Sequence, residues 1–429
     1  MSAAVCEADI LRMDRHDRLL EFRKEFFILE NTIYMDGNSL GLQCRAAARR
    51  VEQVMNDWRN RGIGGWMDGT PAWFTLSETL GEMAAPLVGA LPGEVVATGT
   101  TTVNIHSLVA SFFNPLPGKD KILADELNFP TDLYALDGQL RLRGLDPVRH
   151  LVRVRSGDGR TLDEEKIIAA MTEDVALVFL PSVLFTSGQL LDMPRLSAAA
   201  REREILIGFD CSHSAGAVPH QLHKWGIDFA LWCSYKYLNG GPGSPAFLFV
   251  HERHHGSRHP RLPGWFGFVK EKQFDLLPDF IPQPDAGAWQ ISSPGILGAA
   301  AVAGALEVIR EAGIDAIRKR SLLLTDLLMR LVDERLSHPP YSFRIVNPQE
   351  DGRRGGHVAL ARDHESLRIA AALKARGIIP DFRPPDTIRI APVALYNTAQ
   401  EVYRVVQALV EIIDNREYTR FPTTRGAIT

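Results

Sequence analysis

The sequence has few cysteines, and none of them is arranged for a metal or a disulfide framework. Four occur among 429 residues, namely Cys6, Cys44, Cys211 and Cys233, without a CxxC pair or a Cys/His ligand spacing. Scattered thiols in a chain of this length are typical of reduced intracellular proteins. We therefore expect free thiols, no bound metal ion and a cytoplasmic location.

A large charge excess and long apolar runs are also missing. Lys and Arg number 48 against 52 Asp and Glu, a net charge of −4, which gives no reason to expect a nucleic acid or an anionic membrane as partner. No stretch of about 18 uncharged apolar residues occurs, so we expect no membrane-spanning helix. Acidic residues interrupt the apolar residues of segment 1–22, so we expect no signal peptide there.

What is present is an alternation of short apolar runs and helical stretches from about residue 95 onward. The strand candidates are 94–99, 121–125, 175–180, 204–210, 228–234 and 245–250, and a helix candidate at 103–113 follows the first. This order predicts an α/β fold whose sheet is largely parallel and has helices on both faces. The nearly continuous apolar strands fit burial on both sides.

The pattern changes near residue 296, where a long helical stretch is followed by short strands and two further helices. The last helix is well signalled, because Thr398 and Glu401 form a capping-box pattern. We expect an N-terminal segment (1–45) that packs on a small domain, a large domain over 46–298, and the small α+β domain over 299–429.

One lysine stands in an unusual setting. In SYKYLNGGPG (234–243), Lys236 lies between two tyrosines and shortly before three glycines. Asp210 ends a strand candidate, His213 follows it, and ligands of such sheets bind beyond the carboxyl ends of strands. A lysine and a carboxylate at neighbouring strand ends suit pyridoxal phosphate (PLP), because the amine forms an imine and the acid keeps the ring nitrogen protonated. By itself, Asp210 could equally cap the next helix.

Two further segments could complete a PLP site. Thr101 and Thr102 stand where a strand candidate leads into a helix, and free helix amides with hydroxyls bind phosphate. Phe129 and Asp132 in NFPTD follow another strand candidate, so the phenyl ring could stack on a flat cofactor while Asp132 bonds it or positions His213. Threonine capping and a proline turn over a core phenylalanine are the simpler explanations of each segment alone.

Together these stretches resemble the kynureninase family, a class V-like member of PLP-dependent fold type I in the aspartate aminotransferase superfamily. Eight segments in the family's order carry the resemblance: YMDGNSLGL (34–42), TTVNIH (101–106), FPTDLY (129–134), FDCSHSAG (209–216), WGIDFALWCSYKYLNGGPG (225–243), GWFG (264–267), ISSP (291–294) and IRIAPVALYN (388–397). The resemblance implies a large PLP-binding domain with a mixed, mostly parallel sheet. It also implies hydrolytic cleavage of the Cβ–Cγ bond of L-kynurenine, or of a ring-substituted analogue, to an anthranilate and L-alanine.

The resemblance also implies roles, position by position. Catalytic roles fall to Lys236 as the Schiff-base lysine, Tyr235, Asp210 and Asp132. Cofactor contacts fall to Thr101, Thr102, Phe129, Asp132, Asp210, His213, Tyr235, Lys236, Trp265 and Ser293. Substrate contacts fall to Arg389, Trp66 and Asn38, and the guanidinium fork of Arg389 fits an α-carboxylate. Trp265 and Ser293 would come from the partner subunit of a homodimer with shared active sites.

The residues expected around the aryl ring depart from the family pattern. Thr186, Ser187 and Ser293 replace the usual residues, and segment 62–74 matches poorly. Ile63 or Gly64 stands where some members have a histidine, and we expect Trp66 to take over its role. We therefore keep two substrates open: plain kynurenine and a ring-substituted kynurenine that carries, for example, a hydroxyl or methyl group. The sequence does not predict which substituent, which pathway (tryptophan catabolism or a biosynthesis), or any assembly beyond the dimer.

Two alternatives stay open. The first is a class V aminotransferase or a cysteine desulfurase, although a desulfurase needs an exposed cysteine on a mobile loop and no cysteine lies in an obvious one. The second is a PLP-binding protein without catalysis, against which the presence of Lys236, Asp210 and Arg389 argues. A histidine-rich segment, HERHHGSRHP (251–260), could suggest a metal site; we interpret it as a solvated loop, because no separate ligand cluster supports a metal.

Overall fold

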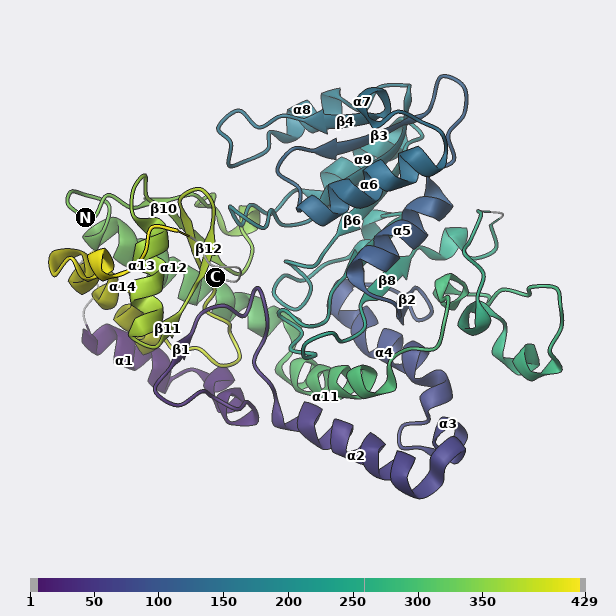
Figure 1. Ribbon diagram of the computed structural model, residues 1–429, viewed down its shortest axis with the longest axis horizontal. Helices are drawn as coiled ribbons and strands as arrows, with labels where there is room; N and C mark the ends of the chain where they lie inside the picture. The colour runs from purple at the N-terminus through teal and green to yellow at the C-terminus, as the bar shows by residue number, and fades with distance from the viewer. Residues whose placement is uncertain (1–6, 258, 425–429) are drawn as a thin grey trace.

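A seven-stranded sheet organises the larger lobe of the computed structural model, which describes residues 7–257 and 259–424 (Figure 1). Its strands are β2 (Val95–Ala97), β3 (Lys121–Asp125), β4 (Leu151–Val154), β5 (Val175–Pro181), β6 (Leu206–Asp210), β7 (Phe229–Trp232) and β8 (Phe247–Val250). They lie in the order β2-β8-β7-β6-β5-β3-β4. Only β8 runs antiparallel to its neighbours, so the predicted mixed, mostly parallel sheet is confirmed.

Helices cover both faces of this sheet, as its buried strands require. Helices α5 (Thr101–Phe112) and α6 (Pro130–Leu142) share one buried apolar cluster with the strands. Helices α4 (Leu76–Ala84) and α9 (Met193–Glu202) belong to the cluster on the other face. Every residue of β7 and β8 is buried, which explains why these strands read as unbroken apolar runs.

Two long helices connect the lobes at their base. Helix α11 (Ile296–Ala312) packs closely on α2 (Arg45–Arg61): a Cβ atom at Gly304 would lie 2.4 Å from the carbonyl group of Ala46, so only glycine permits this approach. Gly313, with φ 78°, then turns the chain into α12 (Ile314–Arg335) of the smaller lobe. The predicted domain limits at 45/46 and 298/299 stay predictions. We propose Gly313 as the second limit, because α11 packs into the core of the large lobe.

The smaller lobe is built on a four-stranded antiparallel sheet. In spatial order its strands are β12 (Asp381–Arg383), β13 (Thr387–Ile390), β10 (Val358–Ala361) and β9 (Arg344–Ile345). It shares one buried core with α12, α13 (Ser366–Ala375) and α14 (Ala399–Asp414). Helix α14 begins with the predicted capping box, in which the Thr398 hydroxyl accepts the Glu401 N–H and the Glu401 carboxylate accepts the Thr398 N–H.

The N-terminal segment lies against the smaller lobe. The carboxylate of Asp14, in α1 (Glu7–Arg15), accepts the N–H groups of Ala399 and Gln400 at the start of α14, at 2.8 and 3.0 Å. Strand β1 (Ile33–Tyr34) pairs in parallel with β11 (Ile378–Ile379). The segment then leads into the region between the two lobes.

Short elements complete the chain. The remaining α-helices are α3 (Gly65–Asp68), α7 (Pro147–His150), α8 (Glu164–Ala169) and α10 (Leu222–Trp225). Strand β4 was not predicted; it lies at the edge of the sheet, and Arg153 interrupts its apolar pattern. No helix within residues 7–257 or 259–424 has both the length and the apolar character needed to cross a bilayer.

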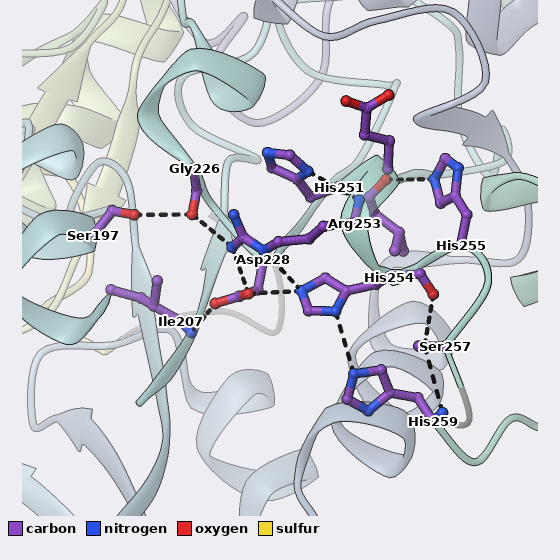
Figure 2. A network of polar contacts seen from close by, with 12 residues as sticks. Ser197, Ile207, Gly226, Asp228, His251, Arg253, His254, His255, Ser257 and His259 are labelled. Atoms are coloured by element: carbon purple, nitrogen blue, oxygen red, sulfur yellow. Dashed lines mark hydrogen bonds and ion pairs between the residues drawn. The ribbon is translucent and has the colours of Figure 1, made fainter. Parts of the chain in front are cut away.

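The histidine-rich segment 251–260 is a solvated loop only in part: Glu252, Arg253, Gly256 and Pro260 are exposed, whereas His251 and His254 are buried. Figure 2 shows two of its side chains, Arg253 and His254, turned toward Asp228, a buried residue just before β7. The Asp228 carboxylate accepts from Arg253 Nη2 at 2.6 Å and bonds His254 Nε2 at 2.7 Å. His254 is buried and its ring meets Phe112 edge-on. A buried carboxylate needs such donors, which explains why His254 is buried beside Asp228.

Candidate active site

A cavity of about 270 Å³ lies between the lobes, at the carboxyl ends of the large sheet. Ten of the thirteen predicted site residues line it: Asn38, Thr101, Thr102, Phe129, Asp132, Asp210, His213, Tyr235, Lys236 and Arg389. Five further residues complete the lining: Ser39, Thr131, Phe185, Ser212 and Arg383. Loops after β3, β6 and β7 bring most of these side chains together, and the small sheet supplies the two arginines.

Two carboxyl groups lie at the floor of the cavity. Asp210 ends β6, and its Oδ1 accepts the N–H of Ser212 at 2.7 Å. Asp132 is buried, and neither of its carboxyl oxygens has a hydrogen-bond partner among the described residues. Burial, together with the negative charge of Asp210, raises the pKa of Asp132 well above its usual value. A buried carboxyl pair with only one donor among the described residues suits a protonated ring nitrogen, so these residues fit the pyridinium of PLP.

The reactive lysine is held by an imidazole. Lys236 Nζ lies 3.0 Å from His213 Nε2. Burial and the positive charges of Lys236 and Arg389 lower the pKa of His213 far below its usual value, so the ring is neutral and its Nε2 accepts the lysine N–H. The other ring nitrogen, Nδ1, is buried without a partner among the described residues. It is free to bond a ligand or a water molecule.

The start of α5 provides an anion site. Thr100 precedes this 12-residue helix and makes no side-chain capping bond, so the simpler explanation of the threonines as caps does not hold for it. Thr101 and Thr102, the first two residues of the helix, line the cavity, so the helix N-terminus lies where a phosphate group could bind. Tyr235 lines the same cavity, and burial, with the nearby Cys233, raises the pKa of its phenol.

The opposite end of the cavity carries the predicted carboxylate site. Arg389, on β13, is buried, and its Nη1 donates to the Phe185 carbonyl at 2.6 Å. Phe185 also meets Phe129 edge-on, with ring centroids 5.1 Å apart. The sequence analysis named neither Phe185 nor Arg383 as a site residue. Phe185 stands beside the unusual Thr186, which was the available signal; Arg383 had none.

Three predicted residues lie outside this cavity. Trp66 packs edge-on against Trp73, 5.9 Å between centroids, and near Phe266. Trp265 is 46% exposed and Ser293 is also exposed. The last two were predicted to serve the site of a partner subunit, and that role stays a prediction. Trp66 does not line this cavity, and its predicted contact with the substrate also stays a prediction.

One group of possible metal ligands lies elsewhere in the large lobe. Glu94 Oε1 lies 2.9 Å from His223 Nδ1, and His251 is close to both. However, Glu94 Oε1 also accepts the Glu252 N–H and Oε2 accepts the Leu91 N–H, each at 2.8 Å. Both oxygens therefore already hold donors, and a structural role explains the cluster. The absence of a metal stays a prediction.

Comparison with solved structures shows which class of fold this is. The cysteine desulfurase from Thermococcus onnurineus superposes with a TM-score of 0.76 over 97% of this chain and 100% of that chain, at 18% identity. A C-DES mutant, solved with glycine covalently linked to its PLP cofactor, gives 0.77 over 91% of this chain and 99% of that chain, at 16% identity. The fold is thus that of PLP-dependent fold type I, and the donor set of the cavity fits that cofactor.

Sequence comparison then identifies the family. Residues 317–409 match the kynureninase C-terminal domain. Kynureninase from Geobacillus thermodenitrificans is 53% identical over 417 residues, which cover 97% of this chain and 96% of that protein. The Bacillus anthracis kynureninase is 51% identical over 418 residues, 97% of each. The chain belongs to the kynureninase family.

The alternative activities are not favoured. Identity with the cysteine desulfurase is 18%, which shows a common fold and nothing more. A desulfurase also needs an exposed thiol, whereas Cys44, Cys211 and Cys233 are buried, and burial raises the pKa of each. Cys6 lies outside the described residues.

Proposed function

We propose that this protein is a PLP-dependent hydrolase of carbon–carbon bonds in ketonic substances. It cleaves the Cβ–Cγ bond of L-kynurenine to anthranilate and L-alanine. One observation carries the proposal: ten predicted site residues, drawn from both lobes, line a single cavity in a chain that is about half identical to kynureninases along its whole length.

The residues of the cavity divide into three sets around the cofactor. Asp210, with Asp132 beside it, would hold the ring nitrogen, the start of α5 and Tyr235 would hold the phosphate, and Phe129 would cover the ring. When bound, PLP supplies an electron-accepting ring next to the substrate α-carbon. Asp210 would keep the ring nitrogen protonated, and Asp132, whose carboxyl oxygens have no partner among the described residues, would lie beside it.

The remaining groups bind the substrate and move its protons. Arg389 orients the α-carboxylate, which sets Cα close to Lys236. The Lys236 amine, oriented by His213, takes the proton from Cα. Water adds to the Cγ carbonyl, and the Cβ–Cγ bond breaks to leave anthranilate and a three-carbon fragment. Tyr235, whose pKa is raised by burial, stays protonated and donates a proton to Cβ, and the acid proton left by the added water replaces it. Lys236 returns the proton it took, so that Cα is protonated again and L-alanine is complete.

A homodimer with shared sites belongs to this proposal. Segment 262–280 exposes an unusual set of large apolar side chains: Leu262, Trp265, Phe274, Leu276, Leu277 and Phe280. Such a patch is typical of a surface covered by another subunit. We propose a second copy of the chain as its occupant, with Trp265 of the partner subunit and Ser293 of the partner subunit at the phosphate.

The proposal also includes where the enzyme works, in which pathway, and on which ring of the substrate. We propose a cytoplasmic enzyme of tryptophan catabolism, since the relatives along the whole chain are named kynureninases. Thr186 and Ser187, which differ from the family pattern, follow Phe185 of the cavity lining, so a 3-hydroxylated or methylated ring stays a prediction. A higher kcat/KM for plain kynurenine than for its ring-substituted analogues would remove it.

A direct assay tests the activity. The PLP-loaded protein is incubated with kynurenine or 3-hydroxykynurenine while fluorescent anthranilates and alanine are measured, with Lys236→Ala as the inactive control. Borohydride reduction and peptide mapping are expected to place a pyridoxyl group on Lys236. Turnover only in the presence of a keto acid would indicate an aminotransferase. Cofactor absorbance without any turnover would indicate an inactive PLP-binding protein.

A further inference from the structure

Two strands of the small sheet place three charged side chains side by side. In the antiparallel pair of β12 and β13, Asp381 lies directly opposite Arg389, and Arg383 lies opposite Thr387. Side chains two residues apart on a strand share a face, so Asp381 and Arg383 point the same way. Neighbours across the pair also share a face, which brings Arg389 to them. The register alone therefore puts two guanidinium groups around one carboxylate.

That carboxylate binds both arginines through one oxygen. Asp381 Oδ2 accepts from Arg389 Nε at 2.5 Å and from Arg383 Nε at 2.8 Å. It also forms an ion pair with Arg389 Nη2. Asp381 is 3% exposed, so it is a buried acid that fixes the orientation of both guanidinium planes.

The donors of Arg389 are almost all in use. A guanidinium carries five N–H groups. Those of Nε and Nη2 go to Asp381 and to the Ser39 hydroxyl, and one of Nη1 goes to the Phe185 carbonyl. One N–H of Nη1 remains, whereas a fork-like grip on a carboxylate takes two parallel N–H groups. Arg389 as it lies here can give a substrate one hydrogen bond without breaking another.

Arg383, in contrast to Arg389, has most of its N–H groups unbound among the described residues. Its Nε is bound to Asp381, but its Nη1 and Nη2, which carry four N–H groups, have no hydrogen-bond partner in the part of the chain that the structure describes. It lines the same cavity as Lys236 and Arg389, and its side chain is 27% exposed against 1% for Arg389. A cation with free donors inside a cavity is a ready anion site.

The hairpin that carries Arg383 is fixed from the other lobe. Arg160 Nη2 donates to the Asp386 carboxylate at 2.6 and 2.7 Å, and Arg160 Nη1 donates to the Thr387 hydroxyl at 2.9 Å. Asp386 lies in the turn between β12 and β13, and Thr387 is the first residue of β13. The backbone of Arg383 is thus held against the lobe that carries Lys236, at a place set by the fold.

We propose that Arg383 is a second substrate-binding arginine, which grips the α-carboxylate of the amino-acid substrate together with Arg389. Asp381 is the positioning residue that joins the two into one unit. The inference rests on the proposed cleavage of kynurenine, whose α-carboxylate is the anion to be bound. The two arginines have different roles. Arg389 is buried and supplies one hydrogen-bond donor, whereas Arg383 supplies the two parallel N–H groups that bind the carboxylate in a bidentate way.

The decisive variant is Arg383→Gln, with Arg383→Lys as the conservative partner. In the PLP-loaded protein, KM for kynurenine is expected to rise about tenfold or more, because a charge-assisted hydrogen-bond pair is lost. The value of kcat is expected to stay within about threefold, because binding and not chemistry changes. Arg383→Lys keeps the charge without the fork, so its KM is expected to fall between the two.

A binding measurement distinguishes recognition of the α-carboxylate end of the substrate from recognition of its aryl end. L-alanine keeps the α-amino and α-carboxylate groups but lacks the aryl ring, so Arg383→Gln is expected to weaken its binding, followed by the cofactor absorbance, by a similar factor. Inhibition by anthranilate is expected to stay unchanged. Arg344→Gln on β9 removes an exposed arginine that pairs with Asp363 in the same small sheet, and serves as the matched control.

The outcomes are distinct. If the wild-type protein cleaves no kynurenine, the proposed function fails. If it cleaves kynurenine but Arg383→Gln leaves KM and L-alanine binding unchanged, or weakens anthranilate instead, the role of Arg383 is wrong. If circular dichroism shows that Arg383→Gln does not fold, Arg383→Lys is tested instead. A wild-type KM and an unchanged L-alanine affinity in Arg383→Lys would then overturn the proposal.

Discussion

Nζ of Lys236 lies 3.0 Å from Nε2 of His213. The contact joins the loop after β7 to the loop after β6, two neighbouring strands of the large sheet. Because burial and nearby cations keep His213 neutral, its ring accepts a hydrogen bond and does not repel the lysine. The imidazole therefore orients the amine that we propose as the base for the Cα proton.

Replacement of this imidazole tests its role. His213→Leu removes the acceptor but keeps a side chain of similar bulk, so kcat for kynurenine is expected to fall about tenfold as the amine loses its orientation. Steady-state kinetics measure the change, and His338→Leu, at an exposed position, is the control. An unchanged kcat in His213→Leu would show that the amine is oriented by other groups.

The phenol of Tyr235 provides the second prediction. Its pKa is raised by burial, so it stays protonated throughout the working range and can donate a proton. Tyr235→Phe is expected to lower kcat about 100-fold, the usual contribution of a general acid, with little change in KM. The pH dependence of kcat is measured for both proteins; the role is wrong if rate and profile are the same.

Asp125 predicts a pH dependence of stability. It ends β3 with 0% exposure, and burial raises the pKa of its carboxyl group from 3.8 to about 7. The stabilising contribution of a raised carboxyl pKa is complete below pH 3.8 and is lost as pH rises to about 7, because the folded protein keeps a proton that the unfolded chain releases. The loss is about 1.4 kcal/mol for each pH unit in that window.

The neutral variant Asp125→Asn removes this dependence. Its free energy of unfolding in urea, relative to the wild type, is expected to increase from pH 4 to pH 7 and then to level off. Asp158→Asn is the control: burial there is outweighed by hydrogen bonds from Thr161 and its neighbours, which lower the pKa of Asp158 to about 2. Its difference from the wild type is therefore flat over the same range. A flat difference for Asp125→Asn would contradict the prediction.

Mixed dimers test the shared site. Lys236→Ala and Trp265→Ala are each expected to be inactive or nearly so as homodimers. After subunit exchange, a mixed dimer joins the intact Lys236 of one subunit to the partner's Trp265, so about a quarter of wild-type activity is expected to return with random pairing. If both variants are dimeric and exchange subunits but no activity returns, Trp265 and Lys236 serve a site within the same chain. A monomeric wild-type protein would contradict the proposed homodimer.

Much of the site could be predicted because it follows strand ends. Asp210 closes an apolar strand and Lys236 follows the next one, and parallel strands bring their carboxyl ends to one edge. Thr101 and Asp132 start the helices that follow two other strands. Each of these positions can be recognised from a local pattern, since the apolar run, the turn and the helix start are all encoded nearby.

The elements that were missed depend on pairing between distant segments. Strand β4 at the sheet edge is only partly apolar, because one side of it is not covered by a further strand. Segment 251–260 was predicted to be solvated, yet Asp228 binds Arg253 and His254, and His254 is buried. In both cases the environment, and not the local composition, decides burial.

By itself, the sequence determined the alternation of strands and helices, the lysine and the acid that suit PLP, and the family. Only the tertiary structure decided that Arg383 faces the cavity with free donors while Arg389 is nearly saturated. The reason is register: the pairing of β12 with β13 sets which side chains share Asp381, and pairing across a hairpin is a property of the folded sheet.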